Sequence, residues 1–285
     1  MITTATANVI REEADMSTRQ IGNQYSTGLS RSRIEQALVA AGKDLGNLRP
    51  DDLADLEDFH TLGRIATGQL ADVAEITSDD DVLDAGSGIG GTARFLAEHF
   101  GCTVAAIDFT EEYCETARWL NQLVGLDKRI SVRAGDVTDL PFDPASFTAV
   151  FSQHVQMNVA NKARLYQEAR RVLTTGGRLA VWDVTSGTRG RLDYPVPWAD
   201  KADVSHVVPA DQLRAVIEAA GFAVTHWADL TEQAAAFMRS WLAAPPGPLG
   251  LHVFVDDFTQ KADNLVGALN SGRLRVVQGV ARARA

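Results

Sequence analysis

The stretch Asp84-Ala85-Gly86-Ser87-Gly88-Ile89-Gly90-Gly91 lies between a short apolar run and a segment with helical periodicity. Glycines at such a junction let the backbone turn tightly and approach a ligand closely, because they carry no side chain. The first turn of the following helix adds amide groups that have no partner within the helix. The stretch therefore predicts a nucleotide-binding turn between a strand and a helix.

Strands and helices alternate from this turn onward. Apolar runs predict strands at 81–84, 103–107, 130–134, 147–151 and 178–181. Helical periodicity predicts helices at 92–99, 111–124 and 161–173, and Thr174–Gly177 is expected to be a turn. Alternation of this kind means a parallel sheet with helices on both faces.

The pattern changes after the fifth predicted strand. The remaining residues predict helices at 210–220, 231–242 and 256–269, and strands at 222–227 and 274–281. A final strand that is reached through a long excursion is expected to join the sheet antiparallel, at its edge. We therefore expect an α/β fold: a three-layer Rossmann-like sandwich with a seven-stranded, mostly parallel sheet, its last strand antiparallel, and a helical cap.

The chain is expected to divide into two parts. Residues 1–76 form an N-terminal tail and helices, at 31–41 and 61–75, that cover the site. Residues 77–285 form the main domain, with cap insertions at about 185–205 and 231–270.

Composition limits the classes of function. The chain has 285 residues and a formal net charge of −10, which argues against a nucleic acid partner, because phosphate binding needs a basic face. No segment reaches about 18 uninterrupted apolar residues, so no membrane span is expected. Cys102 and Cys114 suit neither a disulfide framework nor a metal site, and no metal is expected. We expect a cytoplasmic monomer or homodimer.

Gly86, Gly88 and Gly91 also have the spacing of a dinucleotide fingerprint, so NAD is an alternative ligand. Asp84 favours S-adenosylmethionine, because a carboxylate suits its ammonium and sulfonium and is awkward beside a pyrophosphate. Asp108 ends the next strand, where a carboxylate can accept hydrogen bonds from ribose hydroxyls.

Two further observations favour S-adenosylmethionine over NAD. Asp136 follows the third strand and can accept the adenine amino proton, while Val137 packs on the ring. The glycine turn also begins more than 80 residues into the chain, after helices that are able to fold over the site.

Four segments together resemble the class I methyltransferases over about 81–184. Val82–Gly90 is similar to their first motif, and Asp108 to their ribose-binding acid. The other two similarities are Leu140–Asp143 with Ser146-Phe147, and Arg171–Leu173 with Gly176-Gly177. The resemblance implies S-adenosylmethionine as cofactor, bound by Tyr25, Asp84, Gly86, Ser87, Gly88, Gly90, Asp108, Phe109, Asp136, Val137 and Ser152.

Within this family the chain resembles enzymes that act on small molecules. Asp58–Gly63 and Phe151–His154 are similar to segments of the sarcosine/dimethylglycine and phosphoethanolamine N-methyltransferases and of natural-product sugar O-methyltransferases. The resemblance implies methyl transfer to the nitrogen or oxygen of a small-molecule acceptor. The alternatives are a C-methyltransferase of a quinone-like or isoprenoid metabolite, an NAD-dependent oxidoreductase, and a binding module without activity.

His154 is the leading candidate for a base, because it follows the fourth strand and an unperturbed histidine titrates near pH 6.5. The alternative is a loop histidine bonded to backbone. The N-methyltransferases have an acid at this position. The sugar methyltransferases place paired histidines where this chain has Met157 and Asn158.

The expected acceptor-binding residues are polar or aromatic side chains near the same strand ends. Gln153 and Asn158 are amides that either orient an acceptor or cap the next helix. Trp182 and Trp198 either hold a cationic amine by cation–π contact or pack in the core. The full expected set is His60, Gln153, Met157, Asn158, Trp182, Asp183 and Trp198. An apolar cap with Trp198, Trp241, Leu242 and Phe254 favours an acceptor larger than glycine.

Overall fold

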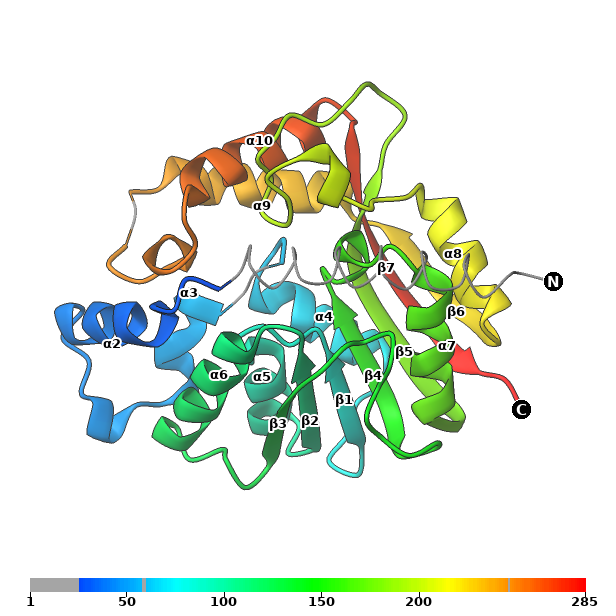
Figure 1. Cartoon of the computed structure of the whole chain (residues 1–285), viewed down its shortest axis with the longest axis horizontal. Helices are drawn as coiled ribbons and strands as arrows, with labels where there is room; N and C mark the ends of the chain where they lie inside the picture. The colour runs from blue at the N-terminus through cyan, green and yellow to red at the C-terminus, as the bar shows by residue number, and fades with distance from the viewer. Residues whose placement is uncertain (1–25, 58–59, 246) are drawn as a thin grey trace, which may run out of the picture.

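The computed structural model describes residues 26–57, 60–245 and 247–285. A seven-stranded sheet in the order β3-β2-β1-β4-β5-β7-β6 forms the centre of the molecule (Figure 1). The strands are β1 Asp81–Ala85, β2 Thr103–Asp108, β3 Ile130–Ala134, β4 Phe147–Gln153, β5 Leu173–Ser186, β6 Phe222–Asp229 and β7 Leu274–Ala283. Pairing is parallel from β3 through β5 and antiparallel on both sides of β7. The expected fold class is thereby confirmed.

The position of the last strand differs from the prediction. Strand β7 lies between β5 and β6, so β6 forms the edge. In β7, Val276, Val277 and Val280 are all buried. Burial on both faces is typical of a strand inside a sheet rather than at its edge. An apolar strand gains more by pairing on both sides, because both faces and both edges are then removed from water.

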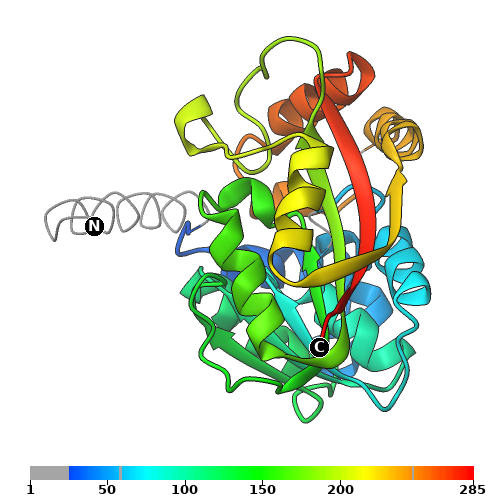
Figure 2. The ribbon, with the colours of Figure 1, turned by 90° about the vertical axis from the view of Figure 1, so that its right-hand side faces the viewer.

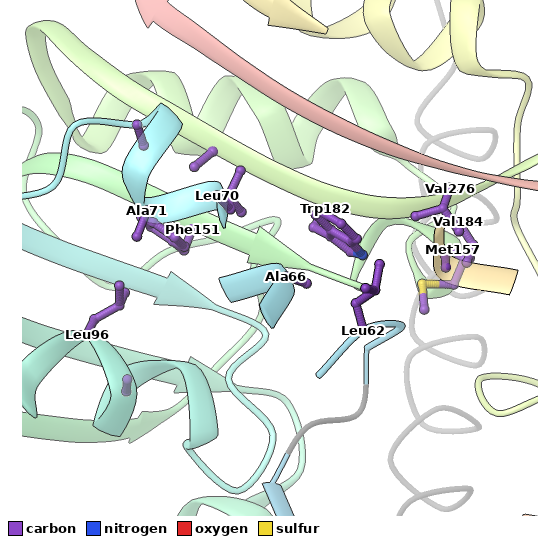
Figure 3. Packing of buried hydrophobic residues seen from close by; sticks show 14 of the residues in the cluster. Leu62, Ala66, Leu70, Ala71, Leu96, Phe151, Met157, Trp182, Val184 and Val276 are labelled. Atoms are coloured by element: carbon purple, nitrogen blue, oxygen red, sulfur yellow. The ribbon is translucent and has the colours of Figure 1, made fainter. Parts of the chain in front are cut away.

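Helices cover both faces of the sheet. Their bounds are α2 Ser30–Ala40, α3 Ala54–Glu57, α4 Arg64–Val73, α5 Gly91–His99, α6 Glu111–Leu123, α7 Lys162–Val172, α8 Ala210–Ala219, α9 Thr231–Ala243 and α10 Phe258–Asn270. Successive strand residues point to opposite faces. Phe151 and Trp182 therefore pack under α4 and α5 (Figure 3), whereas Val150 and Val181 pack under α7 and α8.

Two groups of helices lie at the carboxyl ends of the parallel strands. Helices α9 and α10 and the connection 187–209 lie above these ends in Figure 1, and Figure 2 shows the same arrangement from the side. A third apolar cluster joins α2, α3 and α6 to α10, through residues such as Ile34, Leu56, Leu120 and Phe258. The fold thus brings the N-terminal helices and the late helices to the same end of the sheet.

Three predicted boundaries need correction. Thr174–Gly177 was expected to be a turn, yet β5 begins at Leu173 and absorbs it, with a register shift between Phe147 and Ala149 of β4. The helix expected from Thr61 begins at Arg64, because the preceding Leu62-Gly63 has positive φ angles, which an α-helix excludes. Strand β5 also runs on to Ser186, since β7 pairs with it as far as that residue.

In the part of the chain that the structure describes, no helix is long and apolar enough to cross a membrane. Both cysteines are buried and free.

Candidate active site

The glycine turn adopts backbone angles that suit glycine. Gly86, Gly88 and Gly90 have φ angles of 87°, 53° and 89°. A Cβ on Gly86 would lie 2.4 Å from Cγ2 of Val155, so the turn lies directly against the segment that follows β4. The amides of Gly86 and Ser87 both donate to the carbonyl of Ile107, at 2.8 and 3.0 Å, which joins the ends of β1 and β2.

Asp108 connects the glycine turn to the end of β2. One carboxylate oxygen accepts the Gly88 amide at 2.8 Å, and the other accepts the Thr110 amide at 2.9 Å. Burial raises the pKa of Asp108, and the two amides act in the opposite direction. A carboxylate oxygen can accept two hydrogen bonds, so both oxygens keep capacity for hydroxyl donors. The neighbouring Phe109 is 39% exposed and stands open for contact with a ligand.

Asp84 is almost fully buried, and its Oδ2 has no hydrogen-bond partner among the described residues. Burial, together with the nearby charge of Asp108, raises the pKa of Asp84 to about 7, although the Ala93 amide and Arg94 lower it. A cation beside Asp84 would favour its ionised form. Ser87 Oγ is a second buried group for which the described residues offer no partner.

Asp136 and Val137 follow β3. Asp136 Oδ1 accepts both the amide and the hydroxyl of Thr138, at 2.7 and 2.8 Å, which holds the turn closed. Val137 is buried in the cluster that contains Ile107. These two residues therefore stand beside the end of β2, where an adenine ring attached to the ribose at Asp108 would be expected.

The donor and acceptor set fits S-adenosylmethionine. A buried carboxylate without a partner suits an ammonium group, and a half-buried carboxylate at the end of β2 suits ribose hydroxyls. Glycine at position 86 lets the turn lie directly against Val155, which any larger residue would prevent. A pyrophosphate in the same place would meet the repulsion of Asp84 and Asp108.

Glu112 fastens the start of the described chain to α6. Its carboxylate accepts the Ser26 hydroxyl at 2.8 Å and the amides of Gly28 and Ser30, each at 2.7 Å. Burial alone would raise the pKa of Glu112, but these hydrogen bonds lower it to about 2. Tyr25, expected to contact the cofactor, lies outside the described residues, as do Asp58 and Phe59.

A chain of side-chain contacts joins the end of β4 to α4 and α5. Gln153 Oε1 accepts the hydroxyls of Thr67 and Thr92, at 3.3 and 3.0 Å. The Thr67 hydroxyl also lies 3.3 Å from His60 Nε2. Burial lowers the pKa of His60 to about 4, which keeps its imidazole neutral at pH 7.

His154 is placed by the strand that precedes it and by Thr61. Its amide donates to the carbonyl of Trp182 at 2.8 Å, and its φ of 54° turns the chain away from the sheet. The Thr61 hydroxyl lies 3.4 Å from His154 Nε2 and accepts the Trp182 indole N–H at 3.0 Å. The rings of His60 and His154 are 6.2 Å apart. The structure therefore brings together three of the expected acceptor-binding residues and the candidate base.

The other expected residues lie elsewhere. Asp183 is fully buried and, by strand alternation, faces α7 rather than the side of Trp182, so it is not on the expected rim. Burial raises its pKa well above the ordinary value, although the backbone at Gln156 and Val155 acts against this. Ser152 lies on the same face, with its hydroxyl buried and lacking a partner in the described chain.

Trp198 and Met157 pack in the core. Trp198 is 1% exposed, and its indole N–H donates to Ser205 Oγ at 2.9 Å. Met157 lies near Trp182 and Leu62 (Figure 3). Neither side chain is open to solvent. Asn158 is half-buried at the end of a short turn before α7.

An apolar pocket of about 280 Å³ lies beside His60, and of the apolar cap residues expected from the sequence only Trp241 lines it. We call it the cap pocket. Its lining residues are Ala54, Asp55, His60, Thr61, Leu62, Gly63, Arg64, Ile65, Pro197, Phe237, Met238, Trp241, Leu251, Val255, Phe258, Ala262 and Leu265. The apolar faces of α9 and α10 were the sequence signal for this pocket. The opposite wall, at the start of α4, lies over 160 residues earlier, so the sequence did not indicate that the two would meet.

The described residues contain no group of three or more His, Cys, Asp or Glu side chains that could hold a metal.

Comparisons with known proteins agree with this geometry. Residues 83–181, which contain the glycine turn, Asp108, Asp136 and the end of β4, match the family described as "Methyltransferase domain". A sarcosine/dimethylglycine N-methyltransferase of Halorhodospira halochloris is 29% identical over 206 residues, which cover 70% of this chain and 74% of the relative. Methyltransferase GfsG of Streptomyces halstedii is 27% identical over 245 residues, which cover 84% and 82%.

The fold has a solved counterpart in the geranyl diphosphate C-methyltransferase of Streptomyces coelicolor A3(2), which was crystallised with S-adenosyl-L-homocysteine. The TM-score is 0.69 at 17% identity, and the match covers 93% of this chain and 97% of that one. Residues 83–181 thus match a methyltransferase domain, and the fold is that of methyltransferases solved with S-adenosyl-L-homocysteine or S-adenosylmethionine.

Proposed function

We propose that this S-adenosylmethionine-dependent methyltransferase transfers a methyl group to the nitrogen or oxygen of a small-molecule acceptor, with His154 as the base. One observation carries the proposal. His154 lies at the end of β4 and is oriented by Thr61, and the next residue, Val155, packs against Gly86 of the cofactor turn. The candidate base is therefore next in sequence to the residue that packs against the cofactor-binding turn.

The cofactor, when bound, supplies an electrophilic methyl group on a sulfonium. Asp108 would hold the ribose, and Asp84 would face the ammonium, so that the protein fixes both ends of the cofactor. Alignment of two bound reactants can lower a barrier by about 7–11 kcal/mol. Most of the rate enhancement would therefore come from positioning.

His154 would remove or share the proton that the acceptor loses. The Thr61 hydroxyl already accepts the Trp182 indole N–H, so its own hydrogen is free to point toward His154 Nε2. A neutral imidazole that accepts this hydrogen bond has its other nitrogen protonated. Thr61 and Trp182 would thus fix the orientation of the ring, and an acceptor hydroxyl or amine would displace or share the Thr61 contact.

His60 would act as a neutral polar contact. Its lowered pKa keeps it uncharged, so it can accept a hydrogen bond from an acceptor but does not repel a cationic amine. Gln153, held by Thr67 and Thr92, keeps its amide nitrogen buried without a partner among the described residues, and that donor is available to an acceptor oxygen.

The relatives support a small-molecule acceptor without fixing the atom. Solved structures of this fold include a protein named as a sarcosine dimethylglycine methyltransferase and a geranyl diphosphate C-methyltransferase, so the fold alone does not fix the acceptor atom. The acidic charge of this chain fits poorly with nucleic acid. We further propose a cytoplasmic protein that acts as a monomer or homodimer, with residues 1–76 as a cover over the site.

The test uses the purified chain and S-adenosylmethionine with a deuterated methyl group. Panels of secondary amines, phenols, sugars and carbon nucleophiles are incubated with it. S-adenosylhomocysteine is quantified, and NMR locates the label in the product. Label on nitrogen or oxygen supports the proposal. Label on carbon would support the C-methyltransferase alternative, and cofactor binding without product from any panel would support a binding module.

A further inference from the structure

We propose that the cap pocket binds the apolar, uncharged body of the methyl acceptor. This inference rests on the proposed function and extends it to a substrate class: neutral molecules with a ring-sized apolar part, rather than amino acids or phosphate esters. It comes from the burial, charge and position of the pocket.

The lining of the cap pocket includes buried residues beside the candidate reaction centre and exposed residues at the surface. Among the lining residues, Thr61 and Leu265 are 1% and 4% exposed. Thr61 is the residue that contacts both His154 and Trp182. Ile65 and Trp241, also in the lining, are 50% and 41% exposed. A molecule bound along the pocket would therefore present one end to His154 while its far end reaches the outer rim.

The lining is apolar where the acceptor would lie. Helices α9 and α10 contribute Phe237, Met238, Phe258 and Leu265, and α4 contributes Ile65. The volume of about 280 Å³ is close to the lower end of the range of about 300–1,000 Å³ that is usual for small-molecule sites. Sites of this size and lining gain binding energy by removing apolar surface from water.

Charge in the pocket opposes an anionic acceptor. Among the described lining residues, Arg64 is the sole lysine or arginine. One terminal nitrogen of Arg64 bonds to Asp51 at 2.9 Å, and the other to the Pro50 carbonyl at 2.9 Å and to Glu57 at 3.3 Å. The carboxylates of Asp51 and Glu57 offset the Arg64 charge, and the buried Nε–H is left as a donor for one oxygen.

The two remaining ionisable groups do not supply a counter-charge. His60 is held neutral at pH 7 by its lowered pKa. Asp55 is an acid and would repel a carboxylate or phosphate. Burying an anion without a partner is costly. The pocket thus selects against acceptors such as the sarcosine and dimethylglycine named for one relative, even though the cofactor domains are similar.

The first experiment measures binding with N-phenyl-1-naphthylamine, a neutral apolar dye whose emission rises in apolar sites. Ile65→Asp places a charge on the pocket wall, at a half-exposed position in the first turn of α4, where an acid is compatible with the helix. The matched control is Val39→Asp, at an aliphatic residue of α2 that is 59% exposed and outside the pocket. Circular dichroism verifies that both variants fold.

We expect Ile65→Asp to weaken dye binding at least tenfold and Val39→Asp to leave it unchanged. We expect 2-naphthol to displace the dye at a concentration at least tenfold lower than 6-hydroxy-2-naphthoate, and sarcosine not to displace it. Equal dye binding by Ile65→Asp and the parent chain would overturn the proposal. Stronger displacement by the carboxylate than by 2-naphthol would overturn it as well.

A parallel assay of S-adenosylhomocysteine formation separates this proposal from the proposed function. Methyl transfer to sarcosine, at a rate that Ile65→Asp does not change, would contradict the pocket assignment while the proposed function stands. Dye binding that depends on Ile65, without methyl transfer to any acceptor, would contradict the proposed function while the pocket assignment stands.

Discussion

Arg94 Nε donates to Glu57 Oε1 at 2.6 Å, and both side chains are fully buried behind the glycine turn. The same guanidinium donates to Asn121 Oδ1 of α6 and to the Ile89 carbonyl within the turn. A Cβ on Gly91 would approach Glu57 Cβ to 2.6 Å, so α3 also packs tightly on the start of α5. One arginine thus joins the N-terminal cover, the cofactor turn and α6.

Loss of one partner of this ion pair is expected to destabilise the protein strongly. Glu57→Gln would leave the Arg94 charge buried without its counter-ion, at a cost of about 3–5 kcal/mol of the free energy of unfolding. Urea denaturation measures it. The control is Glu111→Gln, whose pair with Arg118 is exposed on both sides and is worth about 1 kcal/mol or less. Similar losses in the two variants would contradict the role of the Glu57–Arg94 pair.

Alanine substitutions at Gly86 and Gly125 distinguish the effect of backbone strain from that of steric contact. Both have positive φ angles, of 87° and 70°, but only at Gly86 would a Cβ meet another side chain, that of Val155. Gly125→Ala is expected to cost about 1–2 kcal/mol of stability and to leave cofactor affinity unchanged. Gly86→Ala is expected to cost more and to weaken S-adenosylhomocysteine binding at least tenfold in calorimetric titration. Equal effects of the two substitutions would show that the close contact between Gly86 and Val155 does not matter for cofactor binding.

Asp84 is expected to make stability fall as pH rises. Its folded pKa of about 7 lies above the ordinary 3.8, so between these values the folded chain keeps a proton that the unfolded chain has lost. The stabilisation is present at low pH and is lost as pH rises toward 7. Asp84→Asn removes this dependence.

Urea midpoints at pH 5 and pH 8 measure the effect of Asp84. The stability of Asp84→Asn relative to the parent chain is expected to be about 2–3 kcal/mol more favourable at pH 8 than at pH 5. Asn substitution of the exposed Asp79 serves as control and should show no such change. A difference that is the same at both pH values would mean that Asp84 is ionised throughout.

His154→Gln is expected to lower kcat about 10²–10⁴-fold, because the acceptor proton then has no base. The affinity for S-adenosylhomocysteine should remain within a factor of two or so of the parent value, because the His154 ring lies beside Thr61, which lines the cap pocket rather than the glycine turn. Single-turnover kinetics measure the chemical step, and His99→Gln, at an exposed histidine of α5, is the control. An unchanged kcat would show that His154 is not the base and has only a structural role in the loop.

Local signals were sufficient to predict most of the fold. The glycine run and the apolar runs predicted the strands β1 to β5, which pair in parallel. Each strand–turn–helix unit is defined within about 30 residues of sequence. The insertion of β7 between β5 and β6 was not predicted. It depends on pairing between residues about 100 positions apart, such as Asp183 with Val277. A local sequence pattern does not indicate which distant strand a given strand pairs with.

The structure brings some of the candidate residues together and places others in the core, for physical reasons. Trp182 and Asp183 were both assigned to the acceptor, yet they face opposite sides of β5 and both are fully buried. Trp198 was expected either to contact an amine or to pack in the core, and the structure shows the second: it is buried and donates to Ser205. Glu57 and Arg94 lie 37 positions apart and carry no motif, so their contact emerges only from the tertiary structure.

The most direct test of the account is calorimetric titration of the protein with S-adenosylhomocysteine and with NADH, repeated on Asp108→Ala and on the exposed Asp139→Ala. The account predicts that S-adenosylhomocysteine binds and NADH does not. Asp108→Ala should weaken binding by roughly ten- to hundredfold, because a hydrogen bond to a charged group is worth about 1.5–3 kcal/mol, while Asp139→Ala should have no effect. Binding of NADH without S-adenosylhomocysteine, or equal affinities of parent and Asp108→Ala, would contradict it.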